Sequence, residues 1–498
     1  MKKHISILLV VVLSLSFLVG CGGKNKPQEK PNPEGNEVVG DGKIGTEESP
    51  VTVKIIAKDV SPEDEDIKLL VEAIENGLAE EEKYVKIEYL EAPAGKFGES
   101  VPLAFRTGQI DPDIIYFQGG DLPIVNDGML EDLTPYIENS ENINNLLEDH
   151  NKEKIKNYPY LLWLSPARVS VPVMRKDIAE QMDTYETLLE DPTVENYHNF
   201  FKELVDKDLT KYAFTADGDL TRLDSIFNHA FGVTGTVVKE NDSWTFSKAT
   251  NFEKDKLEFY AKLHEEGLID PEYITKKWDT MEKAFYDGDV AIVSSTAGKV
   301  IDIYNEKMTQ TQGEDAELIV LPPAKGLSQG YTSVDVTKES RGFGINSQSD
   351  VKDAAFAVLD FMAGPVGRKL DLIGIEGKHY EIKDDKIVFT EKFPEWWPRF
   401  WETQENFNPE PELKEKTMSE PAYEALEKAK EFYKEDTNII IPQELLPQWD
   451  AMMSLYREYA SDIVRGIKPI DSFDEFVEKW NESGGDEFKD YLNQELNN

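Results

Sequence analysis

The pattern that most constrains the fold is an alternation of strands and a helix between residues 51 and 117. Residues 51–57 are rich in β-branched side chains, and apolar residues at 85–89 alternate with charged ones, as strands do. Between them, apolar residues over 67–78 recur at helical spacing. The run 114–117 is entirely apolar, which is typical of a strand covered on both faces. The sequence therefore predicts a βαβ opening, and with it a parallel sheet flanked by helices.

Beyond this opening, the chain is expected to be mainly helical with a few more strands. The α/β pattern is expected to return after Arg341, where residues 344–346 lead to Ser349, a good N-cap for a helix. Helices are expected over 257–263, 278–285, 351–362, 444–465 and 472–480, and strands over 290–293 and 318–321.

The N-terminus reads as a targeting segment. Lys2 and Lys3 precede an apolar run over 5–19, which is shorter than the roughly 20 residues of a membrane span but has the length of a signal-peptide core. The run ends in Leu-Val-Gly-Cys, which looks like a lipobox, and Cys21 is the only cysteine. Residues 1–20 are therefore predicted to be a lipoprotein signal peptide, and Cys21 to carry fatty-acyl chains of the palmitate type.

Residues 21–50 are predicted to be a flexible tether. They are rich in Lys, Pro, Asn, Glu and Gly and have almost no large apolar side chains, so they cannot bury enough surface to fold. A single cysteine allows no intramolecular disulfide, so the folded part must be stabilised by its core. The remaining length is ample for two domains. The lipid is expected to hold the protein at the extracytoplasmic face of the cell membrane.

The charge balance excludes several kinds of partner. The chain has 54 Lys and Arg against 97 Asp and Glu, a formal net charge of −43. Binding a nucleic acid requires clustered cations, and so does electrostatic adhesion to anionic lipid. No nucleic-acid partner is therefore expected, and the membrane is expected to be reached through the lipid alone.

The usual signatures of enzymes do not occur. The six histidines have no metal-ligand spacing, and neither a G-x-S-x-G elbow nor a phosphate-binding loop occurs. Paired carboxylates can hydrolyse glycosides, but a chain with 97 acidic residues always contains such pairs. No catalytic residue and no cofactor is predicted, and a lipoprotein enzyme acting on polysaccharide fragments stays open as an alternative.

Six motif-like segments occur in order along the chain. They are RTGQIDPDIIY at 106–116, GMLEDLTPYI at 128–137, MRKD at 174–177, EEGLIDPE at 265–272, FYDGDVA at 285–291 and GIEGKHY at 374–380. Together they resemble motifs of family 1 extracellular solute-binding proteins. The last segment is the most specific, and it is similar to the oligosaccharide-binding lipoproteins of the LplA/LipO type.

This resemblance implies a two-lobed, periplasmic-binding-protein-like α/β fold of type II, with a ligand cleft between the lobes. It also implies an oligosaccharide ligand and delivery to the permease subunits of an ABC importer. A receptor for a peptide or polyamine stays open as well, and so does a sensor without a transported ligand. Crossings between lobes are expected near 165–170, 336–341 and 378–386, so that lobe one is 51–165 plus 341–380 and lobe two is 166–340 plus 381–498.

One departure from the family concerns metal binding. Many relatives carry a calcium-type loop, and the corresponding stretch here is 206–212. It lacks the glycine that an oxygen-ligand loop needs for its sharp turn, so no metal site is predicted.

Candidate ligand-binding residues come first from the strand ends, because ligands of open α/β sheets lie beyond the carboxyl ends of strands. Each of these residues follows one of the apolar strands and offers a short polar side chain. The alternative is that Gly119 and Gly120 form only a turn and that Asp121 caps a helix. The candidates are Asp59, Gln118, Asp121, Ser295 and Thr296.

Aromatic residues supply the second set of candidates, since sugars stack their apolar faces on flat rings. Trp163, Trp397, Trp401 and Trp449 are candidates, with core packing as an equal alternative, whereas Trp278 and Trp480 are expected in the core. Arg341, at a predicted crossing, is a candidate for bidentate binding of a carboxylate, which would imply a uronic acid in the ligand. A salt bridge within the protein is the alternative for Arg341.

Overall fold

The first sheet has four strands and contains the predicted βαβ opening. The structure is a computed structural model that describes residues 44–332, 338–404, 406–437 and 439–497. In the order β10-β3-β1-β2, β1 pairs in parallel with both β2 and β3, which confirms the prediction, and β10 is antiparallel to β3. The strands are β1 (Val51–Ile56), β2 (Val85–Tyr89), β3 (Ile114–Gln118) and β10 (Arg341–Ile345).

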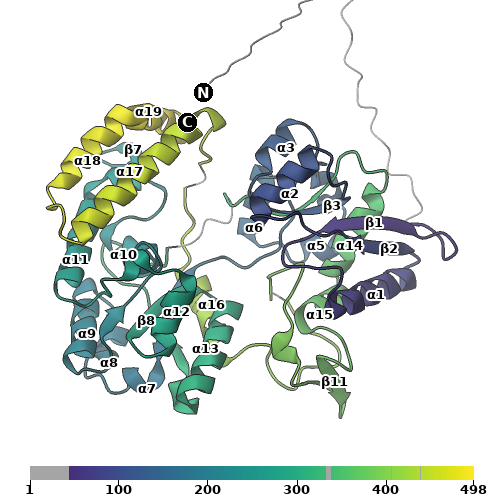
Figure 1. Cartoon of the computed structure of the whole chain (residues 1–498), viewed down its shortest axis with the longest axis horizontal. Coiled ribbons are helices and arrows are strands. Elements are labelled where there is room, and N and C mark those ends of the chain that lie inside the picture. The colour runs from purple at the N-terminus through teal and green to yellow at the C-terminus, as the bar shows by residue number, and fades with distance from the viewer. Residues whose placement is uncertain (1–43, 333–337, 405, 438, 498) are drawn as a thin grey trace, which may run out of the picture. The chain divides into compact units, whose positions relative to one another are not determined.

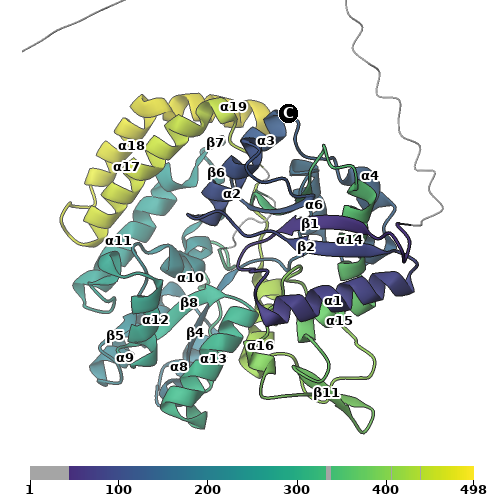
Figure 2. The same ribbon diagram turned by 45° about the vertical axis from the view of Figure 1, so that its right-hand side comes forward.

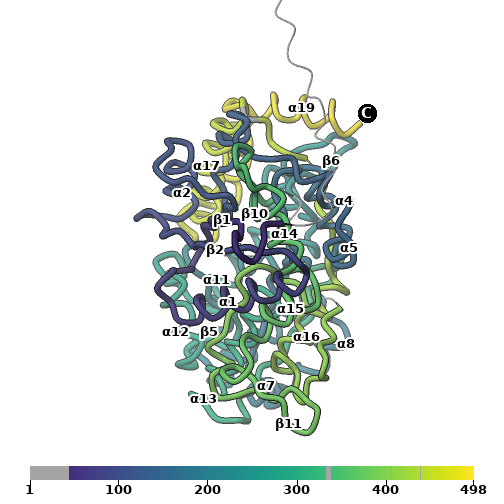
Figure 3. The backbone as a smooth tube through the Cα atoms, turned by 90° about the vertical axis from the view of Figure 1, so that its right-hand side faces the viewer, coloured from purple at the N-terminus to yellow at the C-terminus, as the bar shows by residue number. Residues whose placement is uncertain are grey.

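Helices cover both faces of this sheet. Helix α1 (Glu65–Glu80) begins where the Asp64 side chain accepts the N–H of Asp66 at 2.8 Å, and its apolar stripe is buried against α14 (Lys352–Ala363) and α15 (Pro365–Ile373). Figures 2 and 3 show α1, α14 and α15 gathered along the sheet. The other face packs on α2 (Phe97–Arg106). Shorter helices follow β3: α3 (Leu122–Asn126), α4 (Thr134–Glu138), α5 (Glu141–Asn144) and α6 (Asp149–Asn157).

The second sheet also has four strands, in the order β5-β8-β4-β9, and it too has a core on each face. The long strand β8 lies inside the sheet, where residues 290–295 are fully buried. The strands are β4 (Ser170–Arg175), β5 (Tyr212–Phe214), β8 (Val290–Thr296) and β9 (Leu318–Val320). The helices are α7 (Lys176–Ala179), α8 (Tyr185–Glu190), α9 (Val194–Asp206), α10 (Thr221–Phe231), α11 (Asn251–Glu265), α12 (Trp278–Tyr286), α13 (Lys299–Gln312) and α16 (Glu420–Phe432).

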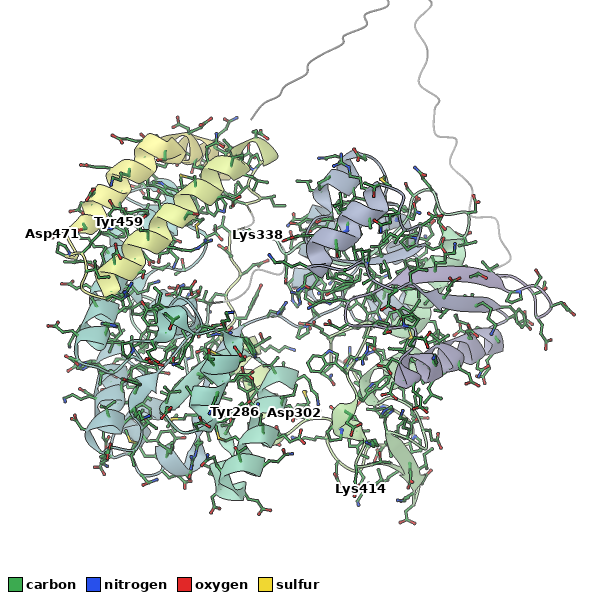
Figure 4. All side chains as sticks on the ribbon, in the orientation of Figure 1. Tyr286, Asp302, Lys338, Lys414, Tyr459 and Asp471 are labelled. Atoms are coloured by element: carbon green, nitrogen blue, oxygen red, sulfur yellow. The ribbon has the colours of Figure 1, made fainter. Side chains whose placement is uncertain are left out.

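The chain ends in a helical group that packs on α11. In Figure 1 the yellow helices α17 (Leu446–Val464) and α18 (Ser472–Trp480) run side by side, followed by α19 (Asp486–Leu496). Helix α19 packs against the second strand of a hairpin, β6 (Val237–Glu240) and β7 (Ser243–Phe246). Tyr459, labelled in Figure 4 on α17, accepts a hydrogen bond from Lys479 of α18 at 2.7 Å.

The expected boundary of the first lobe at residue 380 lies at the start of a hairpin. The hairpin consists of β11 (Tyr380–Lys383) and β12 (Lys386–Phe389), and its turn residues both have positive φ. Trp396, Phe400 and Trp401 are then buried in the core of the first sheet, and the chain joins the core of the second sheet only at Met418. Residues 381–401 therefore pack with the first sheet.

The predicted signal peptide, Cys21 and most of the predicted tether lie outside the described residues. The tether was expected to reach residue 50, but Ile44 already pairs with the sheet edge, where its carbonyl accepts the N–H of Tyr84 at 2.7 Å. Along the described chain, no helix combines the length and hydropathy that a membrane crossing requires.

Candidate functional site

A pocket at the carboxyl ends of β1 and β3, called here the polar pocket, collects most of the predicted ligand-binding residues. Its volume is about 230 Å³. Six of the ten candidates line it, together with residues that the sequence analysis did not select. The predicted residues are Asp59, Gln118, Trp163, Arg341, Trp397 and Trp401, and the others include Lys58, Tyr116, Arg399 and Glu402.

The loop that forms one wall of this pocket is fixed by Asp371 of α15. The carboxylate of Asp371 accepts the backbone N–H groups of Arg399, Phe400 and Trp401 at 2.6, 3.1 and 2.9 Å. The next residue, Glu402, donates its N–H to the carbonyl of Leu164 at 3.0 Å. Burial raises the pKa of Asp371 to about 6, although the three N–H groups act in the opposite direction. Hydrogen bonds to its backbone N–H groups therefore hold the wall in place, in addition to packing.

Trp163 lies at the centre of a cluster of charges. Its ring is almost fully buried, and the guanidinium of Arg341 lies 4.7 Å from the ring centroid. Arg168 and Lys154 lie 5.7 and 5.2 Å from the same ring. Arg341 Nη2 and Arg168 Nη1 both contact Glu339, at 2.7 and 3.3 Å. In a strongly acidic chain, this pocket is therefore bordered by a local concentration of cations.

Lys154 is the most deeply buried of these cations. Its ammonium donates to the carbonyl of Glu339, and only 1% of the residue is exposed. Burial lowers the pKa of Lys154 to about 7, while the carboxylates of Glu339 and Asp121 counteract this effect. The segment 338–341 is held from the second sheet's side as well, since Lys338, labelled in Figure 4, pairs with Asp436 at 3.1 Å.

A second pocket, called here the apolar pocket, adjoins the polar pocket and shares Trp397, Pro398 and Glu402 with it. It also has a volume of about 230 Å³. Thr296, a predicted residue at the end of β8, lines it beside the start of α13. The other lining residues come from both sheets' surroundings and include Arg168, Lys299, Leu372, Phe393, Trp396, Met418 and Leu426.

Residues 63–369 match the profile of the family described as bacterial extracellular solute-binding protein, which is more than half of the chain. The chain belongs to this family. No curated protein matches it at a significant level.

Solved structures support the fold of this solute-binding protein. The alginate-binding protein AlgQ2 has a TM-score of 0.60 at 16% identity, with 89% of this chain and 97% of that chain covered. An extracellular solute-binding protein from Bifidobacterium longum subsp. infantis has a TM-score of 0.64 at 14% identity, covering 90% and 98%. The FusA substrate-binding protein of S. pneumoniae in complex with kestose has a TM-score of 0.60 at 14% identity, covering 90% and 99%. The fold is the two-lobed, periplasmic-binding-protein-like α/β fold.

Three predicted residues of the solute-binding protein lie outside both pockets. Asp121 is buried and its carboxylate accepts a hydrogen bond from Ser340, while Ser295 is completely buried within β8. Trp449 packs against the C-terminal helical group, with its ring centroid 4.8 Å from that of Phe246. These positions follow from tertiary packing, because the strand-end rule and aromatic content do not tell which side chains reach a pocket.

Glu402 and Arg168 are pocket residues that the sequence analysis missed. Arg168 lies inside the predicted crossing at 165–170, and this position is the sequence signal that could have identified it as a pocket residue. Glu402 follows the candidate Trp401 directly, but one acid among many has no distinguishing feature. Burial raises the pKa of Glu402, while Arg168 and Arg341 lower it.

Trp278 is more exposed than the sequence predicts. It was expected in the core, but 43% of it is exposed, whereas Trp480 is completely buried as expected. The guanidinium of Arg222 lies 4.6 Å from the Trp278 ring centroid and is fixed by a hydrogen bond to the carbonyl of Ser294 at 2.7 Å. Trp278 therefore presents a supported, exposed ring near the end of β8.

Among the residues that the structure describes, no group of three or more His, Cys, Asp or Glu side chains is arranged to hold a metal ion.

Proposed function

We propose that this solute-binding protein captures an oligosaccharide outside the cell and delivers it to the permease subunits of an ABC importer. The observation that carries the proposal is the polar pocket, where the exposed ring of Trp397 lies among planar polar groups, while Trp163 and Trp401 line the pocket from buried positions. Sugars present apolar faces edged by hydroxyl groups, so aromatic rings with nearby donors and acceptors suit them. AlgQ2 is described as alginate-binding and FusA was solved with kestose, and alginate and kestose are both saccharides.

The proposed mechanism is binding without chemical change. The polar pocket is built on the first sheet, and the adjoining apolar pocket is lined from both sheets' surroundings, so a ligand that fills both contacts both lobes. Such a ligand stabilises the arrangement in which these contacts are all made. We take the first lobe as 51–165 with 341–401, and the second as most of the remainder.

A thermal-shift screen against neutral and acidic oligosaccharides tests the proposal. With a dissociation constant of roughly 0.1–10 µM, a ligand at 100 times that concentration stabilises the protein by about 2.7 kcal/mol. Sugars that bind should be recovered intact by chromatography. Shortened products would favour the polysaccharide-cleaving alternative, and a shift with polyamines or peptides alone would favour a non-sugar solute.

Transport is a separate part of the proposal. A strain without the protein should lose uptake of the saccharide that binds, and uptake should return with the gene. Unchanged uptake would contradict delivery to an importer and favour a sensor.

The lipid anchor is the part of the proposal that rests on sequence alone. The lipobox-like end of the apolar run, and Cys21 as the only cysteine, support lipidation and attachment to the cell membrane. The similarity of residues 374–380 to the LplA/LipO type supports the same view. A Cys21→Ala variant should appear in the medium or soluble fraction, whereas the unaltered protein should sediment with membranes.

A uronic acid in the ligand is a narrower form of the proposal. Lys58, Arg341 and Arg399 around the polar pocket support it, because cations attract a carboxylate and the two guanidinium groups can bind one bidentately. Arg341, however, already has a carboxylate partner in Glu339 at 2.7 Å. Comparing neutral and uronate oligosaccharides of equal length in the thermal-shift screen decides this point.

A further inference from the structure

Arg341 and Glu402 face each other across a gap in the wall of the polar pocket. Arg341 Nη1 lies 3.9 Å from Glu402 Oε1, which is too far for a direct hydrogen bond. The other edge of the same guanidinium contacts Glu339 at 2.7 Å. Arg341 is therefore held by one carboxylate and faces a second one across an opening.

The Arg341 side chain and the Glu402 backbone are held in place. Arg341 lies on β10 in register with Gln118 of β3, and its guanidinium lies over the ring of Trp163. Glu402 follows the backbone that Asp371 holds and is itself bonded through its N–H to Leu164. The fold therefore sets where the Glu402 backbone lies relative to the Arg341 guanidinium.

The carboxylate of Glu402 is available as a hydrogen-bond acceptor. Within the described residues its contacts are with charges at longer range, chiefly Arg168 and Arg341, and the side chain is 47% exposed. It lies on the wall that the polar and apolar pockets share. A ligand that passes from one pocket to the other therefore passes this carboxylate.

The chemistry of the gap selects the group that fills it. A hydroxyl group accepts a hydrogen bond from a guanidinium and donates one to a carboxylate at the same time. A carboxylate or phosphate only accepts, and it would place a second negative charge beside Glu402. An ammonium group only donates, and it would face Arg341.

We propose that the gap between Arg341 and Glu402 binds one hydroxyl group of a neutral sugar unit, and that Glu402 disfavours a uronic acid at this position. The inference rests on the proposed function and narrows its substrate class at one subsite. A uronic acid elsewhere in the ligand, near Lys58 or Arg399, is compatible with it.

The test uses calorimetry on the mature chain at pH 7. The probes are neutral tetrasaccharides and uronate tetrasaccharides of the same linkage and ring stereochemistry, such as β-1,4-mannotetraose and β-1,4-tetramannuronate. The variant is Glu402→Gln, which keeps the shape and removes the charge. The control is Glu395→Gln on the same segment, whose side chain is 62% exposed and paired with Lys392.

The unaltered protein should bind the neutral member of a pair more tightly than its uronate. Glu402→Gln should weaken binding of the neutral sugar by about tenfold or more and reduce the discrimination against the uronate. Glu395→Gln should behave like the unaltered protein. A Glu402→Gln variant that binds both sugars as before, or an unaltered protein that prefers the uronate, would overturn the inference.

Singly deoxygenated forms of the neutral sugar that binds give a second measurement on unaltered protein. One of them should bind about tenfold more weakly, and Glu402→Gln should weaken that analogue little further, because both changes remove the same hydrogen bond. Additive losses for every analogue would contradict the assignment. If no saccharide of the panel binds unaltered protein, the proposed function fails, and this inference fails with it. If saccharides bind and Glu402→Gln leaves their affinity unchanged, only this inference fails.

Discussion

The carboxylate of Asp371 accepts the backbone N–H of Trp401 at 2.9 Å and thereby fixes the position of Glu402, the next residue in the chain. Asp371→Ala leaves three N–H groups without their acceptor, of which those of Phe400 and Trp401 are buried. We expect it to lower the free energy of unfolding by about 3 kcal/mol and to weaken saccharide binding. Urea denaturation and calorimetry measure the two effects. Glu391→Ala, an exposed acid nearby, is the control, and equal stability of the two variants would contradict the role of Asp371.

Lys154 should make stability depend on pH. Its pKa is about 7 in the fold and 10.5 without the surrounding protein, so between these values the unfolded chain holds a proton that the folded chain does not. The free energy of unfolding contributed by this residue therefore rises with pH, by about 2 kcal/mol from pH 7 to pH 9. Lys154→Met should flatten this rise in urea denaturation.

The control for Lys154 is Lys152→Met on the same helix, because Lys152 is exposed and pairs with Asp149 at 3.3 Å. It should keep the pH dependence of the unaltered protein. Parallel pH profiles for the unaltered protein and Lys154→Met would show that the buried lysine keeps its proton.

Trp278 and Trp480 should behave in opposite ways when replaced by alanine. Trp480 is completely buried, so Trp480→Ala should cost about 3–5 kcal/mol of stability. Trp278 is 43% exposed and stacks on Arg222, so Trp278→Ala should cost less than about 1 kcal/mol. Urea denaturation measures both losses, and equal losses for the two variants would contradict the difference in burial between the two rings.

Trp397 is a pocket residue and Trp449 is a packing residue, so their alanine variants should have different effects. Trp397 lines both pockets and is 42% exposed, so Trp397→Ala should weaken saccharide binding with little change in the melting temperature. Trp449 packs on Phe246 and Phe488, so Trp449→Ala should lower the melting temperature and leave affinity unchanged. The reverse pattern, read by thermal denaturation and titration, would contradict this assignment of the two pockets.

Much of the first sheet was predictable because its pattern is local. The β-branched run at 51–57, the helical spacing over 67–78 and the apolar run at 114–117 specify a βαβ unit with little help from the rest of the chain. The hairpin at 380–389 was not predicted, although its Asp384–Asp385 turn lies inside the expected crossing at 378–386. Where residues 381–401 pack could not be predicted, since it depends on Trp396 and Trp401 meeting a distant core.

The site was predictable where topology alone decides position. Asp59 and Gln118 follow parallel strands, whose carboxyl ends meet at one edge of a sheet, and both line the polar pocket. Exposure of an aromatic ring is different, because it depends on what packs against the ring: Trp449 is covered by Phe246, and Trp278 is left open. The place of Glu402 depends on a loop held by Asp371, for which the sequence has no local pattern.

The most direct test of the central claim is isothermal titration calorimetry of the unaltered protein with oligosaccharides, followed by chromatography of the recovered sugar. A saccharide that binds in the polar pocket should give a dissociation constant of roughly 0.1–10 µM, lose this affinity with Trp397→Ala, and come back intact. No heat with any saccharide, or recovery of shortened products, would contradict the account.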